Sequence, residues 1–370
     1  MMLPYHPALR FKQGEYIATA RIARDVQRHI QPRFILAPPK ERDPEKGKPL
    51  TEEEIAVVTG ERIAKHWPLY PAYLDARYVA PLLGDEGLRS LFRIAQRKNE
   101  QLAAVASVQD LFNPIFREFL RTSGPRIAIH LPYEDIDIDA LLNGVEAVGC
   151  KTSECALFLD FTKAPLSMEG VSGSVAGVFD TLGSVAQWAR IIFQASSFPS
   201  KNPAESDGQC VIPRHEWEVF LAALKECSVA PNLIGYGDFG PDHGEIRFRR
   251  KGGGAAPIRH LRYTGKKSTI VVRGKETGKQ GDVMKAVCER VLNSGEFAGQ
   301  GYSYADDMIW RVAKGLSNAG TPSMWREWNM AHHLSQVVKD LGILSGMSFA
   351  EGPVSRIAEQ FALFAEPVEE

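Results

Sequence analysis

The chain has 370 residues, of which 44% are hydrophobic and 24% are charged, and its formal net charge is −1. These values describe a globular chain with a large core, and they exclude a protein that binds nucleic acid over its whole surface. The cysteines, at 150, 155, 210, 227 and 288, form no CxxC pair, which argues against a structural zinc site and a disulfide framework. No apolar run is long enough for a membrane span, and the first residues lack the basic-then-apolar order of a signal peptide, so we expect a cytoplasmic protein.

Short apolar runs recur along the chain, and a helix-sized segment separates each from the next. They predict strands at residues 9–12, 34–37, 73–77, 102–108, 126–130, 156–160, 191–195 and 233–237. Runs as uniformly apolar as Ala156-Leu-Phe-Leu-Asp160 are typical of parallel strands buried on both faces. Eight such strands with crossover helices predict an α/β fold, a TIM-type (β/α)8 barrel.

The predicted crossover helices cover residues 15–29, 51–67, 88–98, a segment from 113, 136–148, 175–189 and 213–227. Thr51 followed by Glu54 has the spacing of a capping box and marks the start of the second helix.

The regular pattern changes after Asp238. Strands predicted at 246–248, 258–263 and 269–273 indicate a basic β-hairpin-like insertion at about 244–280, before a last barrel helix at 281–292. Helices at 306–316 and 323–341 follow. We therefore expect a barrel over residues 1–300 that includes the insertion, and a C-terminal helical extension over residues 301–370 packed on the barrel.

Functional groups of such barrels gather at the carboxyl ends of the strands. That rule selects Lys12, Asp75, Arg77, Gln109, Asp110, Asp160, Ser196, Ser197 and Asp238. Asp160 and Asp238 directly follow apolar strands and are expected to share one rim, where carboxylates can bind a divalent metal or exchange protons. Lys12 is the third candidate catalytic residue. The alternative is that these carboxylates cap loops or pair with Lys12 and Arg77.

Asp75, Arg77, Ser196 and Ser197 are candidate ligand-binding residues, the two serines as partners for an anion. The sequence identifies no metal-ligand set and no cofactor.

The insertion is the main electrostatic anomaly of the chain. Its cationic residues are Arg247, Arg249, Arg250, Lys251, Arg259, Arg262, Lys266, Lys267, Arg273, Lys275 and Lys279, and Glu276 is the one acid among them. Such a stretch suits phosphates, a nucleic-acid backbone or an acidic protein face. The alternative is a solvated hairpin that balances acidic surface elsewhere.

Several motifs, in this order, resemble those of the phage and prophage beta protein family. They are Lys12-Gln-Gly-Glu15, Ser197-Phe-Pro199, Tyr236-Gly-Asp238, Ile258-Arg-His-Leu-Arg-Tyr-Thr264, Val272-Arg-Gly274, Gly301-Tyr-Ser-Tyr-Ala-Asp306, Trp325-Arg326 and Asn329-Met-Ala-His-His333. The resemblance implies a cytoplasmic protein of phages, satellites or genomic islands with an accessory role in host killing, toxin neutralisation or phage defence. It carries no active site, but it adds Arg262, Tyr263, Arg273, Asp306 and His333 to the candidate ligand-binding residues.

The leading hypothesis is therefore an accessory protein of a mobile element that binds a protein partner or a small anionic ligand. We expect this contact to extend across the insertion and the barrel mouth, which is the end of the barrel where the strands have their carboxyl ends. One alternative is a metal-assisted or acid/base hydrolase of a phosphate ester that uses Asp160 and Asp238. The other is a nucleic-acid binder that uses the basic insertion.

Overall fold

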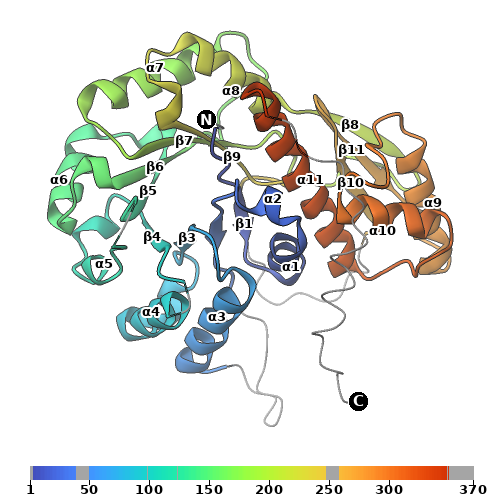
Figure 1. Ribbon diagram of the computed structural model, residues 1–370, viewed down its shortest axis with the longest axis horizontal. Coiled ribbons are helices and arrows are strands. Elements are labelled where there is room, and N and C mark those ends of the chain that lie inside the picture. The colour runs from blue at the N-terminus through green and yellow to red at the C-terminus, as the bar shows by residue number, and fades with distance from the viewer. Residues whose placement is uncertain are drawn as a thin grey trace.

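The computed structural model describes residues 3–38, 50–97, 99–122, 124–246, 258–347 and 349. Eight parallel strands form one sheet in the order β1-β2-β3-β4-β5-β6-β7-β9, with helices around its outside (Figure 1). The strands are β1 Ala8–Arg10, β2 Arg33–Ile35, β3 Ala72–Asp75, β4 Leu102–Ala106, β5 Ile127–Pro132, β6 Cys155–Asp160, β7 Arg190–Ala195 and β9 Ile234–Asp238.

The N-terminal segment joins the two edges of this sheet. Tyr5 forms parallel bridges to both Ile30 and Tyr236. The amide of His6 donates to the Tyr236 carbonyl (2.7 Å), and the amide of Tyr236 donates to the Pro4 carbonyl (3.1 Å). The sheet is therefore a nearly closed parallel barrel of the TIM type, as the strand pattern predicted.

Two glycines of β9 permit this close approach. A Cβ at Gly235 would lie 2.7 Å from the His6 ring, and a Cβ at Gly237 would lie 2.7 Å from the His6 carbonyl oxygen. Neither position has room for a larger side chain, because His6 fills the space inside the barrel next to β9.

Helices connect the strands on the outside of the barrel. They are α1 Gln13–Arg21, α2 Arg24–Gln27, α3 Glu52–His66, α4 Ala80–Gln96, α5 Ile115–Glu118, α6 Ile138–Val148, α7 Val171–Val185 and α8 His215–Glu226, with short 3₁₀ turns at Asp110–Phe112, Tyr133–Asp135, Thr152–Glu154 and Pro231–Leu233. The predicted capping box of α3 is confirmed: the Thr51 hydroxyl accepts from the Glu54 amide (3.3 Å) and the Glu54 carboxylate accepts from the Thr51 amide (2.6 Å).

Side chains alternate between the inside of the barrel and the helical layer. Those that face inward pack into one apolar cluster, formed by Tyr73, Ala103, Val105, Ala128, Ala156, Phe158 and Ile192. Their sequence neighbours, such as Leu157 and Phe193, pack instead into the larger core under the helices. Because the alternation has a period of two, it also fixes the direction of the residues at the strand ends.

The rest of the chain forms a second lobe beside the barrel (Figure 1). Its antiparallel sheet has the order β10-β11-β8, with β8 Gln209–Pro213, β10 His260–Thr264 and β11 Ser268–Arg273. The predicted β10–β11 hairpin is present, with Leu261 opposite Val272. The third strand, β8, comes from the connection between β7 and α8 and was not predicted. Residues 247–257, with most of the strand predicted at 246–248 and its adjacent basic run, lie outside the described residues.

Three helices complete this part of the chain: α9 Gln280–Leu292, α10 Tyr304–Ala313 and α11 Pro322–Leu344. The prediction that residues 281–292 form the last barrel helix is wrong, because α9 packs on α10, β10 and β11 in the second lobe. Instead, α11 packs along α1 of the barrel and also contacts β10 and α10, so it lies between the two parts (Figure 1). In the described part of the chain, no helix has the length and apolar character needed to cross a bilayer.

Candidate functional site

Polar side chains converge inside the barrel at the carboxyl ends of its strands. Asp75, His130, Asp160 and Gln194 each follow an inward-facing apolar residue by two positions, so all four also face inward. Arg33, at the start of β2, reaches into the same group, with its guanidinium 5.2 Å from the centre of the Phe158 ring. We call these five residues the inner cluster.

A fully buried ion pair forms the base of the inner cluster. Arg33 donates through Nε and Nη2 to one oxygen of Asp75 (3.0 and 2.6 Å), and its Nη1 donates to the amide oxygen of Gln194. The other oxygen of Asp75 accepts from Nε of Arg77 (2.9 Å). Burial alone would raise the pKa of Asp75, but the guanidinium groups of Arg33 and Arg77 lower it to about 2. Asp75 is therefore ionised, and both of its carboxylate oxygens accept hydrogen bonds from arginine side chains.

His130 and Asp160 form a second pair in the inner cluster, nearer to solvent. Nε2 of His130 lies 2.8 Å from Oδ2 of Asp160, and Oδ1 of Asp160 accepts from the Thr162 amide (2.9 Å). Burial and the charge of Arg33 lower the pKa of His130 to about 4. Burial would raise the pKa of Asp160, but the hydrogen bond from His130 contributes to lowering it to about 2. At neutral pH the pair is therefore a neutral imidazole beside a carboxylate.

Three arginines from distant segments meet above the β1 and β9 side of the same end of the barrel. Arg10 and Arg262 both donate to the Asp242 carboxylate, Arg262 at 2.9 Å, and Arg326 of α11 lies 3.7 Å from it. Arg326 also pairs with Glu15 of α1 at 3.3 Å. We call Arg10, Arg262, Arg326 and Asp242 the arginine rim.

The charges of the arginine rim are strongly coupled. Burial would raise the pKa of Asp242, but the three arginines hold it well below its usual range. Burial also raises the pKa of Glu15, the second acidic partner of the group. The guanidinium of Arg262 lies 4.3 Å from the centre of the Phe198 ring, and its buried Nε has no acceptor among the described residues.

Asp160 and Asp238 do not share a rim in the way the sequence predicted. Asp238 follows Tyr236, which packs under the helices, so its side chain leaves the outer face of the barrel. There it accepts from the Tyr5 hydroxyl (2.7 Å) and from Nε2 of His333 on α11 (3.0 Å), and it is 1% exposed. The two carboxylates point to opposite faces of the sheet. The prediction that they act together in catalysis or metal binding is therefore wrong.

The other predicted residues fall into two groups. Lys12 directly precedes α1 near Glu15, and the Ser196 hydroxyl donates to the Asp242 carbonyl (2.7 Å), so both lie by the arginine rim. The Ser197 hydroxyl instead accepts from the Glu216 amide (3.0 Å) at the start of α8.

The remaining candidates lie within the second lobe or at its junction with the barrel. The Tyr263 hydroxyl donates to Asp306 (2.6 Å), and Nδ1 of His333 lies 2.9 Å from the Thr264 hydroxyl. Arg273 donates to the Ala204 carbonyl (3.1 Å) and to Glu276 (2.6 Å). These contacts bind elements of the protein to each other.

The mouth also contains residues that were not predicted from the sequence, namely Arg10, Arg33, His130, Gln194, Asp242 and Arg326. One signal for His130 was available, since it ends a predicted apolar strand as Asp160 does. In the part of the chain that the structure describes, no group of three or more His, Cys, Asp or Glu residues is arranged to hold a metal ion.

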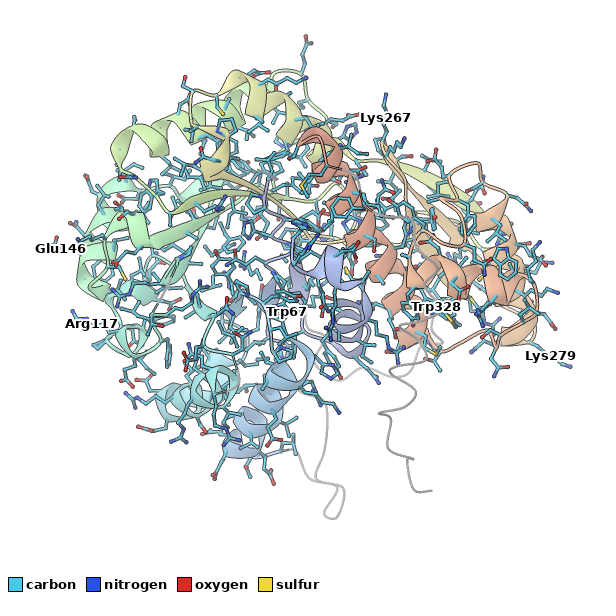
Figure 2. All side chains as sticks on the ribbon, viewed as in Figure 1. Trp67, Arg117, Glu146, Lys267, Lys279 and Trp328 are labelled. Carbon is cyan, nitrogen blue, oxygen red and sulfur yellow. The ribbon has the colours of Figure 1, made fainter. Side chains whose placement is uncertain are left out.

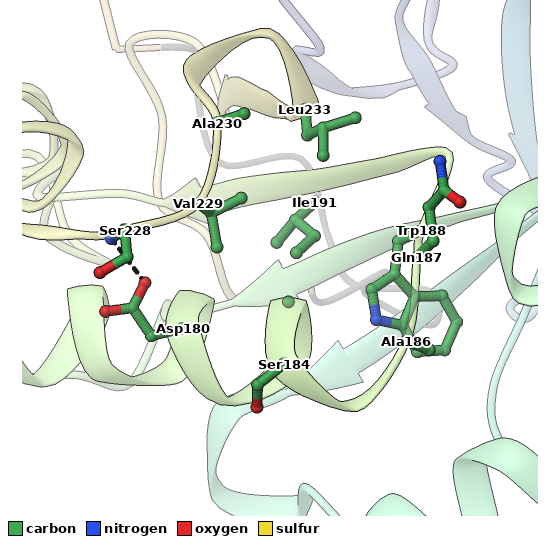
Figure 3. A pocket seen from close by; sticks show the side chains of 11 residues that line it. Asp180, Ser184, Ala186, Gln187, Trp188, Ile191, Ser228, Val229, Ala230 and Leu233 are labelled. Carbon is green, nitrogen blue, oxygen red and sulfur yellow. Dashed lines mark hydrogen bonds between the residues drawn. The ribbon is translucent and has the colours of Figure 1, made fainter.

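A separate cavity of about 590 Å³ lies at the opposite end of the barrel (Figure 3). It is bounded by α7, by Trp188 and Ile191 at the start of β7, and by Leu233 just before β9. Its one acidic side chain, Asp180, accepts from the Ser228 amide (2.7 Å), as the dashed line shows. This cavity is mostly apolar, and no residue of the inner cluster lines it.

Fold and mouth together define an α/β barrel protein with a His–Asp pair and an arginine group at the carboxyl ends of its strands. The family model described as "Beta protein" matches residues 5–339, and the chain belongs to that family, as the order of its motifs indicated. Comparison with curated proteins and with solved structures finds no match.

Proposed function

We propose that the chain binds a small anionic ligand at the barrel mouth, between the inner cluster and the arginine rim. The observation that carries this proposal is the convergence of Arg10, Arg262 and Arg326 on the single carboxylate of Asp242. Even with Glu15 counted, three guanidinium groups face two acids. A partly buried cationic excess is stabilised by an anion, and guanidinium groups match phosphate and carboxylate oxygens in pairs.

Unused hydrogen-bond donors support the same assignment. Arg77 is 30% exposed and uses its Nε and its amide on Asp75, which leaves its terminal nitrogens without an acceptor among the described residues. Inside the mouth, the fully buried amide nitrogen of Gln194 also has no partner there. Donors of this kind at the mouth of a barrel suit a ligand that carries several acceptor oxygens.

Calorimetric titration of the full chain with inorganic phosphate and with succinate tests this proposal. The Arg77→Gln variant should bind the preferred anion about 10- to 100-fold more weakly, which is the usual effect of losing a charge-assisted hydrogen bond. Arg311→Gln is the matched control, because Arg311 makes an exposed pair with Asp307 on α10. The proposal is wrong if wild type binds neither anion at low ionic strength, or if Arg77→Gln binds as wild type does.

The described part of the basic insertion does not favour the nucleic-acid alternative. Arg259 donates to the three backbone carbonyls of residues 275–277, and Arg273 donates to the Ala204 carbonyl and the Glu276 carboxylate. Lys267 and Lys279 lie at separate edges of the second lobe (Figure 2). These cations therefore form no continuous stripe along which a nucleic-acid backbone can run.

Membership of the Beta protein family supports the wider proposal that the protein acts in the cytoplasm in conflict between phage and host. All five cysteines are free, which suits a reducing compartment. The test is the plating efficiency of phages on bacteria that express wild type or Arg77→Gln. Equal plating on both and on a host without the gene would refute this role.

A further inference from the structure

One ring nitrogen of His130 has no hydrogen-bond partner among the described residues, so its lone pair is free. Asp160 is ionised and can only accept, so Nε2 of His130 carries the hydrogen in their 2.8 Å contact. In a neutral imidazole the other nitrogen, Nδ1, then holds the lone pair, and it has no partner among the described residues. The Thr162 amide fixes the second oxygen of Asp160 at 2.9 Å, so the carboxylate in turn fixes the ring.

This arrangement has the parts of a general base held by a positioning residue. The side chains of His130 and Asp160 are 9% and 18% exposed, so the pair is largely withdrawn from water but still reachable from the mouth. Arg77, whose terminal nitrogens are unused, acts electrostatically on His130 and lies at the same strand ends. A ligand held by Arg77 at these strand ends therefore lies within electrostatic range of the His130 ring.

We infer that His130 is the proton acceptor in the hydrolysis of a phosphate ester held at the mouth by Arg77, with Asp160 as the residue that positions its ring. This inference rests on the proposed anion site. A phosphate ester fits because its planar pairs of oxygens match a guanidinium group, and because its reaction requires placement and charge stabilisation more than a covalent group on the protein.

The step balances without an added oxidant, reductant or metal. Nδ1 of His130 takes a proton from a water molecule as the water oxygen bonds to phosphorus. The ester P–O bond breaks and its electron pair goes to the leaving oxygen, which takes a proton from solvent water, while the imidazolium gives its proton back to water. The products are an alcohol and phosphate, and His130 is neutral again.

Ligand binding itself improves the base. In the free protein, burial and arginine charge lower the pKa of His130 to about 4, which makes it a weak proton acceptor. A phosphate next to Nδ1 brings negative charge close to the ring, and an opposite charge at this distance raises the pKa of a histidine. The ring then approaches the range near neutral pH in which a general base is most effective.

The experiment uses the full chain with 4-nitrophenyl phosphate and bis(4-nitrophenyl) phosphate as probes. His130→Asn should lower the rate of nitrophenolate release by about 10²- to 10⁴-fold, the usual effect of a general base. Its affinity for inorganic phosphate should stay within about threefold of wild type, because Arg77 remains. The control is His215→Asn, a partly exposed histidine of α8 that pairs with Glu218.

Asp160→Asn tests positioning. It should lower kcat and move the acidic limb of the pH–rate profile while KM changes little, since a purely structural change would not move the titration of the base. Histidine-labelled NMR adds a readout that needs no variant: Nδ1 of His130 should be unprotonated near pH 7, and phosphate should raise the pKa of this ring.

The outcomes separate the two proposals. A protein that binds no phosphate refutes the anion site. If the protein binds phosphate but hydrolyses neither ester, or if His130→Asn hydrolyses them at the wild-type rate, the role of His130 is refuted while the anion site stands. An unchanged pKa of His130 on phosphate binding likewise overturns its contact with the ligand.

Discussion

Arg33 and Arg77 both pair with Asp75, but Arg33 stabilises the buried core of the barrel whereas Arg77 is placed to bind a ligand. Substitution of each arginine can distinguish these two roles. The side chain of Arg33 is 2% exposed and that of Arg77 is 30% exposed. Arg33→Met leaves Asp75 buried with one guanidinium instead of two, and it also removes the donor to the amide oxygen of Gln194. Arg77→Met removes a partner that water can replace.

The expected magnitudes follow from this difference in burial. The shift of the Asp75 pKa from 3.8 to about 2 corresponds to roughly 2 kcal/mol of stability. Breaking a buried pair by removal of one partner costs about 3–5 kcal/mol, because a charge is left uncompensated. A partly exposed pair contributes about 0–1 kcal/mol. We therefore expect Arg33→Met to be about 2–4 kcal/mol more destabilising than Arg77→Met.

Urea unfolding followed by tryptophan fluorescence measures both variants, with the slope of unfolding free energy against urea checked for constancy. The double variant Arg33→Met with Asp75→Leu should recover much of the loss, since an apolar pair of similar volume removes the carboxylate that has lost its buried partner. Equal losses for Arg33→Met and Arg77→Met would show that burial does not separate the two arginines. The assignment of Arg77 to the ligand would then lose its structural basis.

Two further predictions concern the core of the barrel. Burial lowers the pKa of His6 to about 3 and that of His130 to about 4, whereas both histidines titrate near 6.5 in the unfolded chain. The unfolded chain therefore binds more protons than the folded chain in this pH range. As a result, the free energy of unfolding should fall as the pH drops from about 6.5 to 4. Denaturation at pH 7 and at pH 4.5 measures this fall. The His130→Asn variant should show a weaker pH dependence, and a flat wild-type profile would contradict the prediction. The Gly237→Ala variant should be about 1–3 kcal/mol less stable than wild type, because the new Cβ would meet backbone oxygens at 2.7 and 3.0 Å. The Gly177→Ala variant changes a glycine of α7 that has open space around it, so it should be about 0.5–1 kcal/mol more stable than wild type. Thermal melting compares the two, and shifts in the same direction would refute the close-packing argument.

The barrel was predictable from sequence because parallel strands buried on both faces appear as short apolar runs, and each of the eight predicted runs overlaps a strand of the barrel. Strand β8 was missed for the opposite reason. In Gln209-Cys-Val-Ile-Pro213 only Ile212 is buried, so the run carries little apolar signal, and its partner β11 lies far along the chain. A short edge strand of this kind is specified by its partner more than by its own residues.

The direction of the strand-end residues could not be predicted by the same logic. A run that is apolar on both faces carries no alternation, so the sequence does not indicate whether its last residue points into the barrel or away. Asp160 and Asp238 end similar runs, yet only Asp160 faces inward. The arginine rim was hidden for another reason: Arg10 and Asp242 are separated by 232 positions, and only closure of the barrel brings them together.

The outward direction of Asp238 has its own consequence for the mouth. Its contact with His333 fixes one stripe of α11, on which Asn329 and Arg326 lie one and two turns away. Asn329 accepts from the Arg262 amide (3.0 Å), and Arg326 reaches Asp242, so this stripe carries one rim arginine and holds the strand of another. His333 also bonds Thr264, which ends the same strand, β10. Asp238 thus places two of the three rim arginines from a buried position, although its own side chain faces away from any ligand at the mouth.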